Sequence, residues 1–343
     1  MNLIKKGYIL PSAALGLKVS AIRRVVPCDR PPEVGDVVYG TVTRIGHHSK
    51  LENRSGRIHL IHDGTKAVFV FGNRYAPDFF EGFVPEETVQ DVDLLAQSGL
   101  VGIVRTKNSV VKDPTRVRLS GFVCDGDGRV LNTRAFPLVN PKRTRRKEPR
   151  ARMILVCGTS MNSGKTMAAA ACCWALSTMG HEVRACKVTG TASLKDILHM
   201  NDAGATLYAD FTHLGYPSTY LLPETDVLRI FLHLDLKYAN NPRNFWVVEF
   251  ADGINQRETA MLLESQEVRS RIYRLVLCAG DAFGAVAAVR VLGERFGLVP
   301  DALSGVCSSS PLHIRELREF TDIPVFNSLE PDLSQLAALL RPE

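Results

Sequence analysis

One short segment of the chain has residue types and a spacing suited to holding phosphate groups. It runs from Gly158 to Met167 and reads Gly-Thr-Ser-Met-Asn-Ser-Gly-Lys-Thr-Met. Apolar residues precede it and an alanine-rich stretch follows it, so it joins an expected strand to an expected helix. In such a loop, backbone N–H groups and the helix N-terminus surround a phosphate. A chance Gly-Lys-Thr on a surface turn is the alternative.

The loop assigns separate roles to its residues. We expect Lys165 to reach the β- and γ-phosphates and Thr166 to place its hydroxyl on Mg²⁺. Gly164 lets the backbone approach phosphate without a Cβ clash. Five residues, rather than the usual four, separate the two glycines, so Thr159 stands at the usual first-glycine position. The expected nucleotide contacts are Gly158, Thr159, Ser160, Met161, Asn162, Ser163, Gly164, Lys165, Thr166 and Met167.

Polar side chains after other expected strands are candidates for the same site. Lys187 ends the second strand, 22 residues after Lys165, and Glu249 directly follows an apolar run. Asp202 and Glu249 are hard oxygen ligands suited to Mg²⁺, at strand ends where an α/β sheet collects ligands. We therefore expect Lys165, Lys187 and Glu249 to be catalytic, and Thr166, Asp202 and Glu249 to hold the metal.

Each of these assignments has an alternative. Lys187 could be a solvated residue after a strand, and Asp202 a residue at a helix end. Asp196 and Asp210 compete with Asp202, and Asp252 is the second choice after Glu249. Asp281 could touch substrate or cap the helix that follows it.

These residues resemble those of dethiobiotin synthetase and its relatives among the SIMIBI-class P-loop NTPases. The resemblance rests on the P-loop, on Lys187–Thr191, on Asn201–Ala203 and on Trp246–Gly253, and it covers about half the chain, Met153 to Phe326. It implies that Lys187 contacts phosphate and substrate, and that Asp202 and Glu249 contact Mg²⁺. It also implies ATP-dependent chemistry on a small carboxylate or carbamate.

The chain departs from the synthetase at the substrate and base positions. Met161 and Asn162 stand where the synthetase has Thr and Glu, and Ser309 stands where it has an adenine-reading Asn. Biotin-pathway chemistry is therefore doubtful, and GTP stays open beside ATP. No second lysine lies near Ser160, which disfavours the sandwich dimers of partition ATPases. A P-loop family with acyltransferase members acting on amino acids also resembles the chain, at Gly158-Thr159, Thr189-Gly190 and Asp210-Phe211.

The sequence divides at a basic run between Lys142 and Arg152, which carries the whole net charge of +6. We expect a β-barrel at 1–138, a basic linker at 139–152 and a P-loop domain at 153–343. Before the run, turn signals separate short strand-like stretches, with one helix expected at 86–97. The expected strands are 36–45, 57–61, 67–71, 100–106 and 117–124.

After the run, strands alternate with helices, which predicts a parallel sheet covered on both faces. The fold class is thus α/β with a smaller all-β barrel. The expected strands are 153–157, 182–187, 245–249, 274–279, 302–307 and 323–326, and the expected helices are 166–180, 282–296 and 333–340.

The N-terminal part resembles S1-type OB barrels through Gly35–Ile45 and, weakly, through Phe80–Pro85. OB barrels bind single-stranded nucleic acid on surface aromatic residues beside basic groups. A barrel of this kind could equally cap the nucleotide site or mediate oligomerisation. The candidates for stacking are Phe69, Phe71, Tyr75, Arg57 and Arg74, although Phe69 and Phe71 alternate on one strand face and could be core.

Composition limits the class of protein. The eight cysteines form no CxxC pair, which favours free thiols in a reducing compartment over a zinc cluster. No apolar run is long enough for a membrane helix, and no secretory signal is recognisable. We expect a cytoplasmic homodimer that uses ATP and Mg²⁺ in ligation or phosphoryl transfer on a small molecule. The alternative is an NTPase that controls a protein or nucleic-acid partner bound by the barrel.

Overall fold

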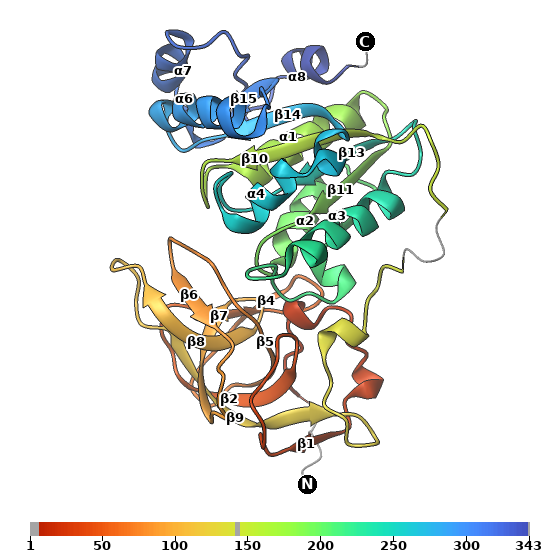
Figure 1. The fold of residues 1–343 in the computed structure, drawn as a ribbon. Helices are drawn as coiled ribbons and strands as arrows, with labels where there is room; N and C mark the ends of the chain where they lie inside the picture. The colour runs from red at the N-terminus through yellow and green to blue at the C-terminus, as the bar shows by residue number, and fades with distance from the viewer. Residues whose placement is uncertain (1–6, 141–144, 342–343) are drawn as a thin grey trace. The chain divides into compact units, whose positions relative to one another are not determined.

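The computed structural model describes residues 7–140 and 145–341. The chain forms two compact units (Figure 1), with the main boundary between Asn140 and Pro141. The first unit also contains Thr191–Lys195 and Phe211–Leu221, two segments that the sequence assigned to the P-loop domain. The described part of the basic run belongs to the second unit, whereas Lys142 and Arg143 lie outside the described residues.

The N-terminal unit contains a closed ring of five strands in the order β9-β2-β5-β8-β7, in which β7 pairs again with β9. Only β5 and β8 run parallel, and the other pairs of the ring are antiparallel. These pairings close the sheet on itself, and the prediction that this unit is an S1-type OB barrel remains a prediction. The strands of the unit are β1 (Arg24–Val26), β2 (Val37–Arg44), β3 (Lys50–Glu52), β4 (Ile58–Leu60), β5 (Lys66–Phe71), β6 (Phe80–Phe83), β7 (Asp91–Ala96), β8 (Leu100–Lys107) and β9 (Thr115–Cys124).

The prediction of a helix at 86–97 is wrong, because this stretch contains strand β7. Val92 and Leu94 are fully buried in the barrel core, two residues apart, as a strand requires. Asp91 and Asp93 alternate with them and form ion pairs with arginines of β9. Pairing with two neighbours in the ring therefore decides the structure of a segment whose local pattern is ambiguous.

The second unit is built on a six-stranded parallel sheet with the order β12-β11-β13-β10-β14-β15. Its register aligns the carboxyl ends of the strands: Glu249 pairs with Val156 and Lys187, and Lys187 pairs with Asp210. These ends form one edge of the sheet, the usual place for ligands in α/β folds. The strands are β10 (Arg152–Gly158), β11 (Val183–Lys187), β12 (Leu207–Asp210), β13 (Phe245–Glu249), β14 (Ile272–Cys278) and β15 (Ala302–Ser304).

Helices cover this sheet, and α1 packs on it through small residues such as Ala168, Ala169, Cys172 and Cys173, which are all fully buried. The expected strand 302–307 ends at Ser304, and in place of the strand at 323–326 the structure has a single bridge from Leu303 to Val325. The helices are α1 (Lys165–Thr178), α2 (Leu194–Asp202), α3 (Glu224–Tyr238), α4 (Arg257–Glu264), α5 (Gln266–Arg269), α6 (Ala282–Val291), α7 (Pro311–Arg318) and α8 (Leu333–Leu340).

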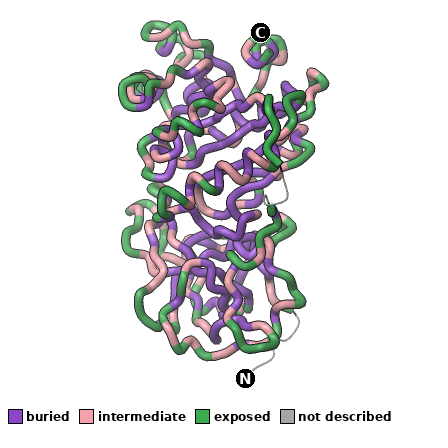
Figure 2. Tube along the Cα trace, turned by 45° about the vertical axis from the view of Figure 1, so that its right-hand side comes forward, coloured by how far each residue is buried: buried purple, intermediate pink, exposed green. Residues whose placement is uncertain are grey.

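In the parallel sheet, β10, β11 and β13 are buried along almost their whole length. Figure 2 colours the trace by burial, with buried residues in purple. The eight cysteines are free thiols, seven of them buried. Within the described residues, none of the helices has the length and apolar character that a bilayer crossing needs.

Candidate nucleotide-binding site

The structure contains the strand, loop and helix that the phosphate-binding segment requires. β10 ends at Gly158, and α1 begins at Lys165. Asn162 and Gly164 have left-handed backbones, with φ of 60° and 95°. A Cβ on Gly164 would lie 2.7 Å from Cα of Gly305, so the helix can start against this neighbouring loop only with glycine.

Lys165 folds back over the loop and is 6% exposed. Its Nζ donates a hydrogen bond of 2.6 Å to the carbonyl oxygen of Ser160, and Ser163 Oγ lies at 3.5 Å. Burial lowers the pKa of Lys165, and the charges of Glu249 and Asp252 oppose this shift. The ammonium thus lies inside the loop with neutral direct partners, where a phosphate could replace them.

Glu249, the last residue of β13, is the centre of a buried cluster of charged and hydroxyl groups. Its Oε2 accepts a hydrogen bond of 3.0 Å from Thr166 Oγ1, and its Oε1 lies 3.3 Å from Lys187 Nζ. Lys187 Nζ also lies 2.5 Å from Asp196 Oδ2. Burial alone would lower the pKa of Lys187, but the charges of Asp196 and Glu249 outweigh it, so the pKa is raised. Lys187 is therefore a permanent cation here.

The prediction that Asp202 joins this cluster requires correction. Asp196 lies in the first turn of α2 and contacts Lys187, whereas Asp202 is the last residue of that helix and is exposed. After α2 the chain enters β12 at Leu207, which pairs with Arg184 near the start of β11. The helix thus carries Asp202 away from the carboxyl edge, and Asp196 occupies the place predicted for it. Asp196 was one of the two competitors that the sequence suggested.

The structure also locates three other candidates from the sequence, two aspartates and one serine. Asp210 ends β12 in register with Lys187 and is 1% exposed. Asp281 Oδ1 accepts a hydrogen bond of 2.6 Å from the backbone N–H of Gly284, so it caps α6. Ser309, at the expected base-reading position, is exposed and donates to the carbonyl oxygen of Val306.

The segment that follows Glu249 forms a wall of the loop, which was not predicted from the sequence. Ile254 N donates a hydrogen bond of 2.8 Å to the carbonyl oxygen of Gly158. A Cβ on Gly253 would collide with the carbonyl oxygen of Thr159. The signal in the sequence was Asp252-Gly253 after a buried strand, a pair typical of a tight turn.

The donor set fits Mg²⁺. Among the described residues, no group of three or more His, Cys, Asp or Glu side chains could by itself hold a metal ion. The site instead offers the Thr166 hydroxyl beside the Glu249 carboxylate, next to the loop that would hold phosphates. Mg²⁺ is commonly bound in this way, through one or two protein oxygens together with phosphate oxygens and water.

Two aromatic candidates for nucleic-acid stacking in the barrel are corrected by their burial. Phe69 and Phe71 are 0% and 1% exposed and belong to the barrel core. Arg74 is also buried, at 6% exposed. Tyr75 is half-buried against Tyr220, with ring centroids 5.6 Å apart. Of the five candidates, only Arg57 is exposed.

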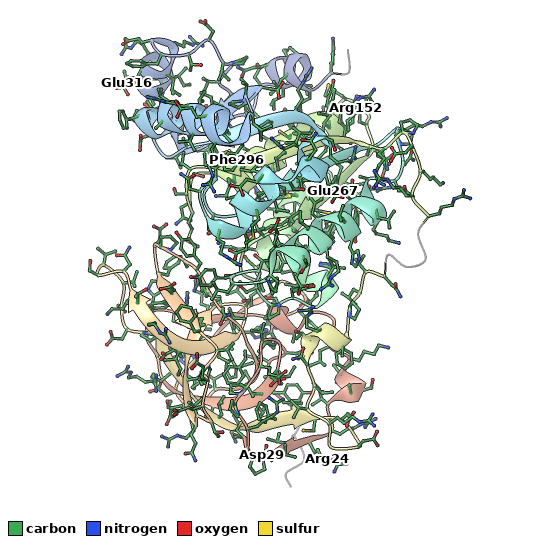
Figure 3. The ribbon with its side chains drawn as sticks, in the orientation of Figure 1. Arg24, Asp29, Arg152, Glu267, Phe296 and Glu316 are labelled. Carbon is green, nitrogen blue, oxygen red and sulfur yellow. The ribbon has the colours of Figure 1, made fainter. Side chains whose placement is uncertain are left out.

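The described end of the basic run is part of the second unit's structure. Arg150 Nη2 lies 2.9 Å from Asp235 Oδ2, and the side chains of both are almost completely buried. Arg152, labelled in Figure 3, begins β10, and its guanidinium lies 5.8 Å from the ring centroid of Phe245. Arg150 is therefore buried in the second unit, and Arg152 is the first residue of β10 rather than part of a free linker.

No protein-family model matches the chain, and no curated protein sequence matches it. Solved structures with weak similarity include the signal recognition particle receptor FtsY of Elizabethkingia anophelis in complex with GDP, with 9% identity, 58% of this chain and 67% of that chain covered, and a TM-score of 0.37. Chloroplast FtsY of Physcomitrella patens has 14% identity, coverage of 60% and 70%, and a TM-score of 0.36. A ParA family ATPase from Chlorobium tepidum TLS has 14% identity, coverage of 55% and 89%, and a TM-score of 0.34. These scores are low, so the interpretation of the second unit rests on its own parallel sheet, loop and charged cluster.

Proposed function

We propose that the second unit binds a nucleoside triphosphate with Mg²⁺ and transfers its γ-phosphoryl group. The observation that carries this proposal is the contact of Thr166 with Glu249 beside the P-loop lysine. A hydroxyl at the start of α1 and a carboxylate at the end of β13 are the protein ligands that a nucleotide-bound Mg²⁺ uses. Lys165 and Lys187 supply two buried cations to the site, and Lys187 contacts Glu249 of this pair.

Each group has a role in this proposal. The loop N–H groups and the N-terminus of α1 hold the phosphate oxygens. Lys165 exchanges the Ser160 carbonyl for phosphate, and Lys187 neutralises charge that develops on the transferred group. Thr166 and Glu249 would hold Mg²⁺, which when bound neutralises the β- and γ-phosphate oxygens. Catalysis would then depend on positioning and electrostatics.

For the acceptor we propose a small carboxylate or carbamate, with ATP as the donor and GTP as the alternative. The support for this is the resemblance of the P-loop and of the segments around Lys187 and Glu249 to dethiobiotin synthetase. The replacements at Met161 and Asn162 argue for a different acceptor from that of the synthetase.

A regulatory NTPase is the second candidate, and one observation favours it. The segments that follow β11 and β12, Thr191–Lys195 and Phe211–Leu221, are grouped with the N-terminal unit. Inside that unit, Thr133 Oγ1 donates to the carbonyl oxygen of Gly215, and Tyr220 donates to Glu81. After the strands that carry Lys187 and Asp210, the chain thus enters segments of the N-terminal unit. A protein or a nucleic acid that binds this unit could therefore influence the site.

The test is binding and hydrolysis of Mg·ATP and Mg·GTP by the full chain. We expect binding to be lost in Lys165→Ala and retained in Lys237→Ala, which removes an exposed lysine of α3. A wild-type chain that binds neither nucleotide would contradict the proposal. Stimulation of turnover by small carboxylates would favour the transferase, and stimulation by RNA or protein the regulatory NTPase.

A further inference from the structure

Lys187 has two carboxylate partners, and the closer of them lies on α2. The Nζ of Lys187 is 2.5 Å from Asp196 Oδ2 and 3.3 Å from Glu249 Oε1. The side chains of Lys187 and Asp196 are 10% and 16% exposed, so water screens this pair little. Burial lowers the pKa of Lys187, and the charge of Asp196 is the largest of the effects that raise it overall, ahead of the charge of Glu249. Asp196 is therefore the main ionic partner of Lys187.

The helix that carries Asp196 holds this carboxylate in place. Asp196 lies in the first turn of α2, and the first two N–H groups of that helix donate to the Glu52 carboxylate at 2.9 and 3.0 Å. Further along the helix, Ile197 and Met200 are fully buried. A helix that is capped at its start and packed along one side has little freedom to move. The Asp196 carboxylate, and with it the ammonium of Lys187, is therefore kept at one place.

Glu249 has a second task in the proposed function. Its Oε2 accepts a hydrogen bond of 3.0 Å from Thr166 Oγ1, and these two side chains would hold Mg²⁺. A bound divalent cation is the largest local charge in such a site. A carboxylate that binds this cation attracts a neighbouring ammonium less strongly than a carboxylate without a metal does. Asp196 is therefore the partner that remains to Lys187 when Glu249 binds the metal.

We propose that Asp196 is a positioning residue, which holds the Lys187 ammonium for the transferred phosphoryl group while Glu249 holds Mg²⁺. This inference rests on the proposed function and deepens it. Asp196 acts through Lys187 rather than on the nucleotide or the metal, and the lysine balances its charge. Without the Asp196 carboxylate, Lys187 would have Glu249 as its nearest anionic partner and would compete with the metal for it.

Two substitutions test the carboxylate itself. Asp196→Asn removes the charge and keeps the size of the side chain, whereas Asp196→Glu keeps the charge. At saturating Mg²⁺, we expect Asp196→Asn to keep the Kd for Mg·ATP within about threefold of wild type and to lower kcat by about tenfold or more, because a displaced lysine costs turnover rather than binding. Asp196→Glu should raise kcat about threefold or more above that of Asp196→Asn, since a carboxylate again reaches the ammonium. Glu224→Gln, which removes an exposed carboxylate from the first turn of α3, is the control.

A double-mutant cycle separates a residue that acts through Lys187 from one that acts by itself. Lys187→Met removes the ammonium and keeps most of the apolar length of the side chain. On this background, Asp196→Asn should change neither kcat nor the Mg²⁺ concentration for half-maximal turnover by more than about twofold. A metal ligand, or a residue that only supports the fold, would cause the same loss on both backgrounds. Thermal melting of the wild type, both single variants and the double variant checks that the fold is kept.

The outcomes distinguish this inference from the function on which it rests. Turnover of Asp196→Asn within about threefold of wild type overturns the role of Asp196 alone. An equal loss on both backgrounds overturns it too, as does a failure of Asp196→Glu to raise turnover. A rise in Kd as large as the fall in kcat would place Asp196 in nucleotide binding and also contradicts the inference. A wild-type chain that binds no Mg·nucleotide overturns the proposed function and the inference together.

Discussion

Two lysines of one site differ in pKa because their direct partners differ. Lys165 faces a carbonyl and a hydroxyl, so burial dominates and lowers its pKa. Lys187 faces Asp196 and Glu249, which raise its pKa. A phosphate entering the loop would give Lys165 the anionic partner that it lacks. At the residue scale, Lys165 therefore lacks an anionic direct partner, whereas Asp196 and Glu249 keep Lys187 charged.

This difference predicts that nucleotide binding takes up a proton at alkaline pH. The free enzyme's Lys165 loses its proton below the ordinary lysine pKa, and bound phosphate favours the charged form. Affinity should therefore fall as pH rises above the lowered pKa of Lys165 toward the ordinary lysine pKa of about 10.4. Calorimetry in buffers of different ionisation enthalpy measures the uptake. Affinity independent of pH across this range would contradict the prediction.

The proposed metal ligands predict a contrast between two acidic residues. Glu249→Gln should raise the Mg²⁺ concentration needed for half-maximal turnover by about tenfold or more, because an amide is a weaker ligand than a carboxylate. Asp202→Asn should leave the Mg²⁺ requirement unchanged, since Asp202 lies at the far end of α2. Magnesium titrations of hydrolysis in both variants make the comparison. An equal effect of the two changes would restore the original assignment of Asp202.

The local motif could be predicted from the sequence, but its long-range partners could only partly be predicted. Gly164-Lys165-Thr166 can be recognised as a phosphate-binding motif because its strand, loop and helix follow one another in the sequence. The choice between Asp196 and Asp202 depends on the direction in which α2 leaves the sheet edge, and neither residue's type reveals it. The left-handed backbone of Asp252 likewise becomes visible only in the fold.

At the scale of elements, α2 begins in one unit and ends in the other. Leu194 and Lys195 are grouped with the N-terminal unit, and the rest of the helix with the second. In the N-terminal unit, the Glu52 carboxylate accepts hydrogen bonds from Leu194 N at 2.9 Å and Lys195 N at 3.0 Å. A carboxylate at a helix N-terminus satisfies free N–H groups and complements the helix dipole. No sequence pattern reveals this cap, because it comes from 142 residues away along the chain.

Removal of this cap should destabilise the protein. Glu52→Ala leaves two helix N–H groups and the Ser12 hydroxyl without their acceptor in a buried place, as Glu52 is 3% exposed. We expect the free energy of unfolding to fall by about 2 kcal/mol. Urea denaturation measures the change against Glu87→Ala, which removes an exposed glutamate of the same unit. A loss no larger than that of the control would show that the cap is unimportant.

Strand pairing limits prediction at this scale as well. The strands at 36–45, 67–71 and 117–124 were recognisable because turn residues bound them. β7 was predicted as a helix, because residues 86–97 alone do not show the pairing of this segment with the next strand, β8, and with β9 farther along the chain. Closure of the ring is therefore a property of the unit rather than of any segment.

At the scale of the whole molecule, the two units do not divide at one point of the chain. Phe211, Leu214 and Tyr216 are buried and belong to the N-terminal unit, although they lie between strands and helices of the second. The sequence predicted the domain boundary near residue 138. It did not reveal that Thr191–Lys195 and Phe211–Leu221 belong to the N-terminal unit, because both segments lie inside the expected α/β domain. A cut at the main boundary would thus remove most of the unit to which these segments belong.

We therefore predict that residues 141–343 expressed alone are unstable. The fragment would carry the buried apolar side chains of Phe211–Leu221 without Thr133, Glu81 and the barrel residues that pack with them. Exposed apolar surface of this kind favours aggregation. We expect low soluble yield and a thermal transition at least about 10 °C below that of the full chain, measured by calorimetry. A fragment that melts like the full chain and binds Mg·ATP equally well would show that the second unit folds independently, in which case Thr191–Lys195 and Phe211–Leu221 would be ordinary loops of that unit.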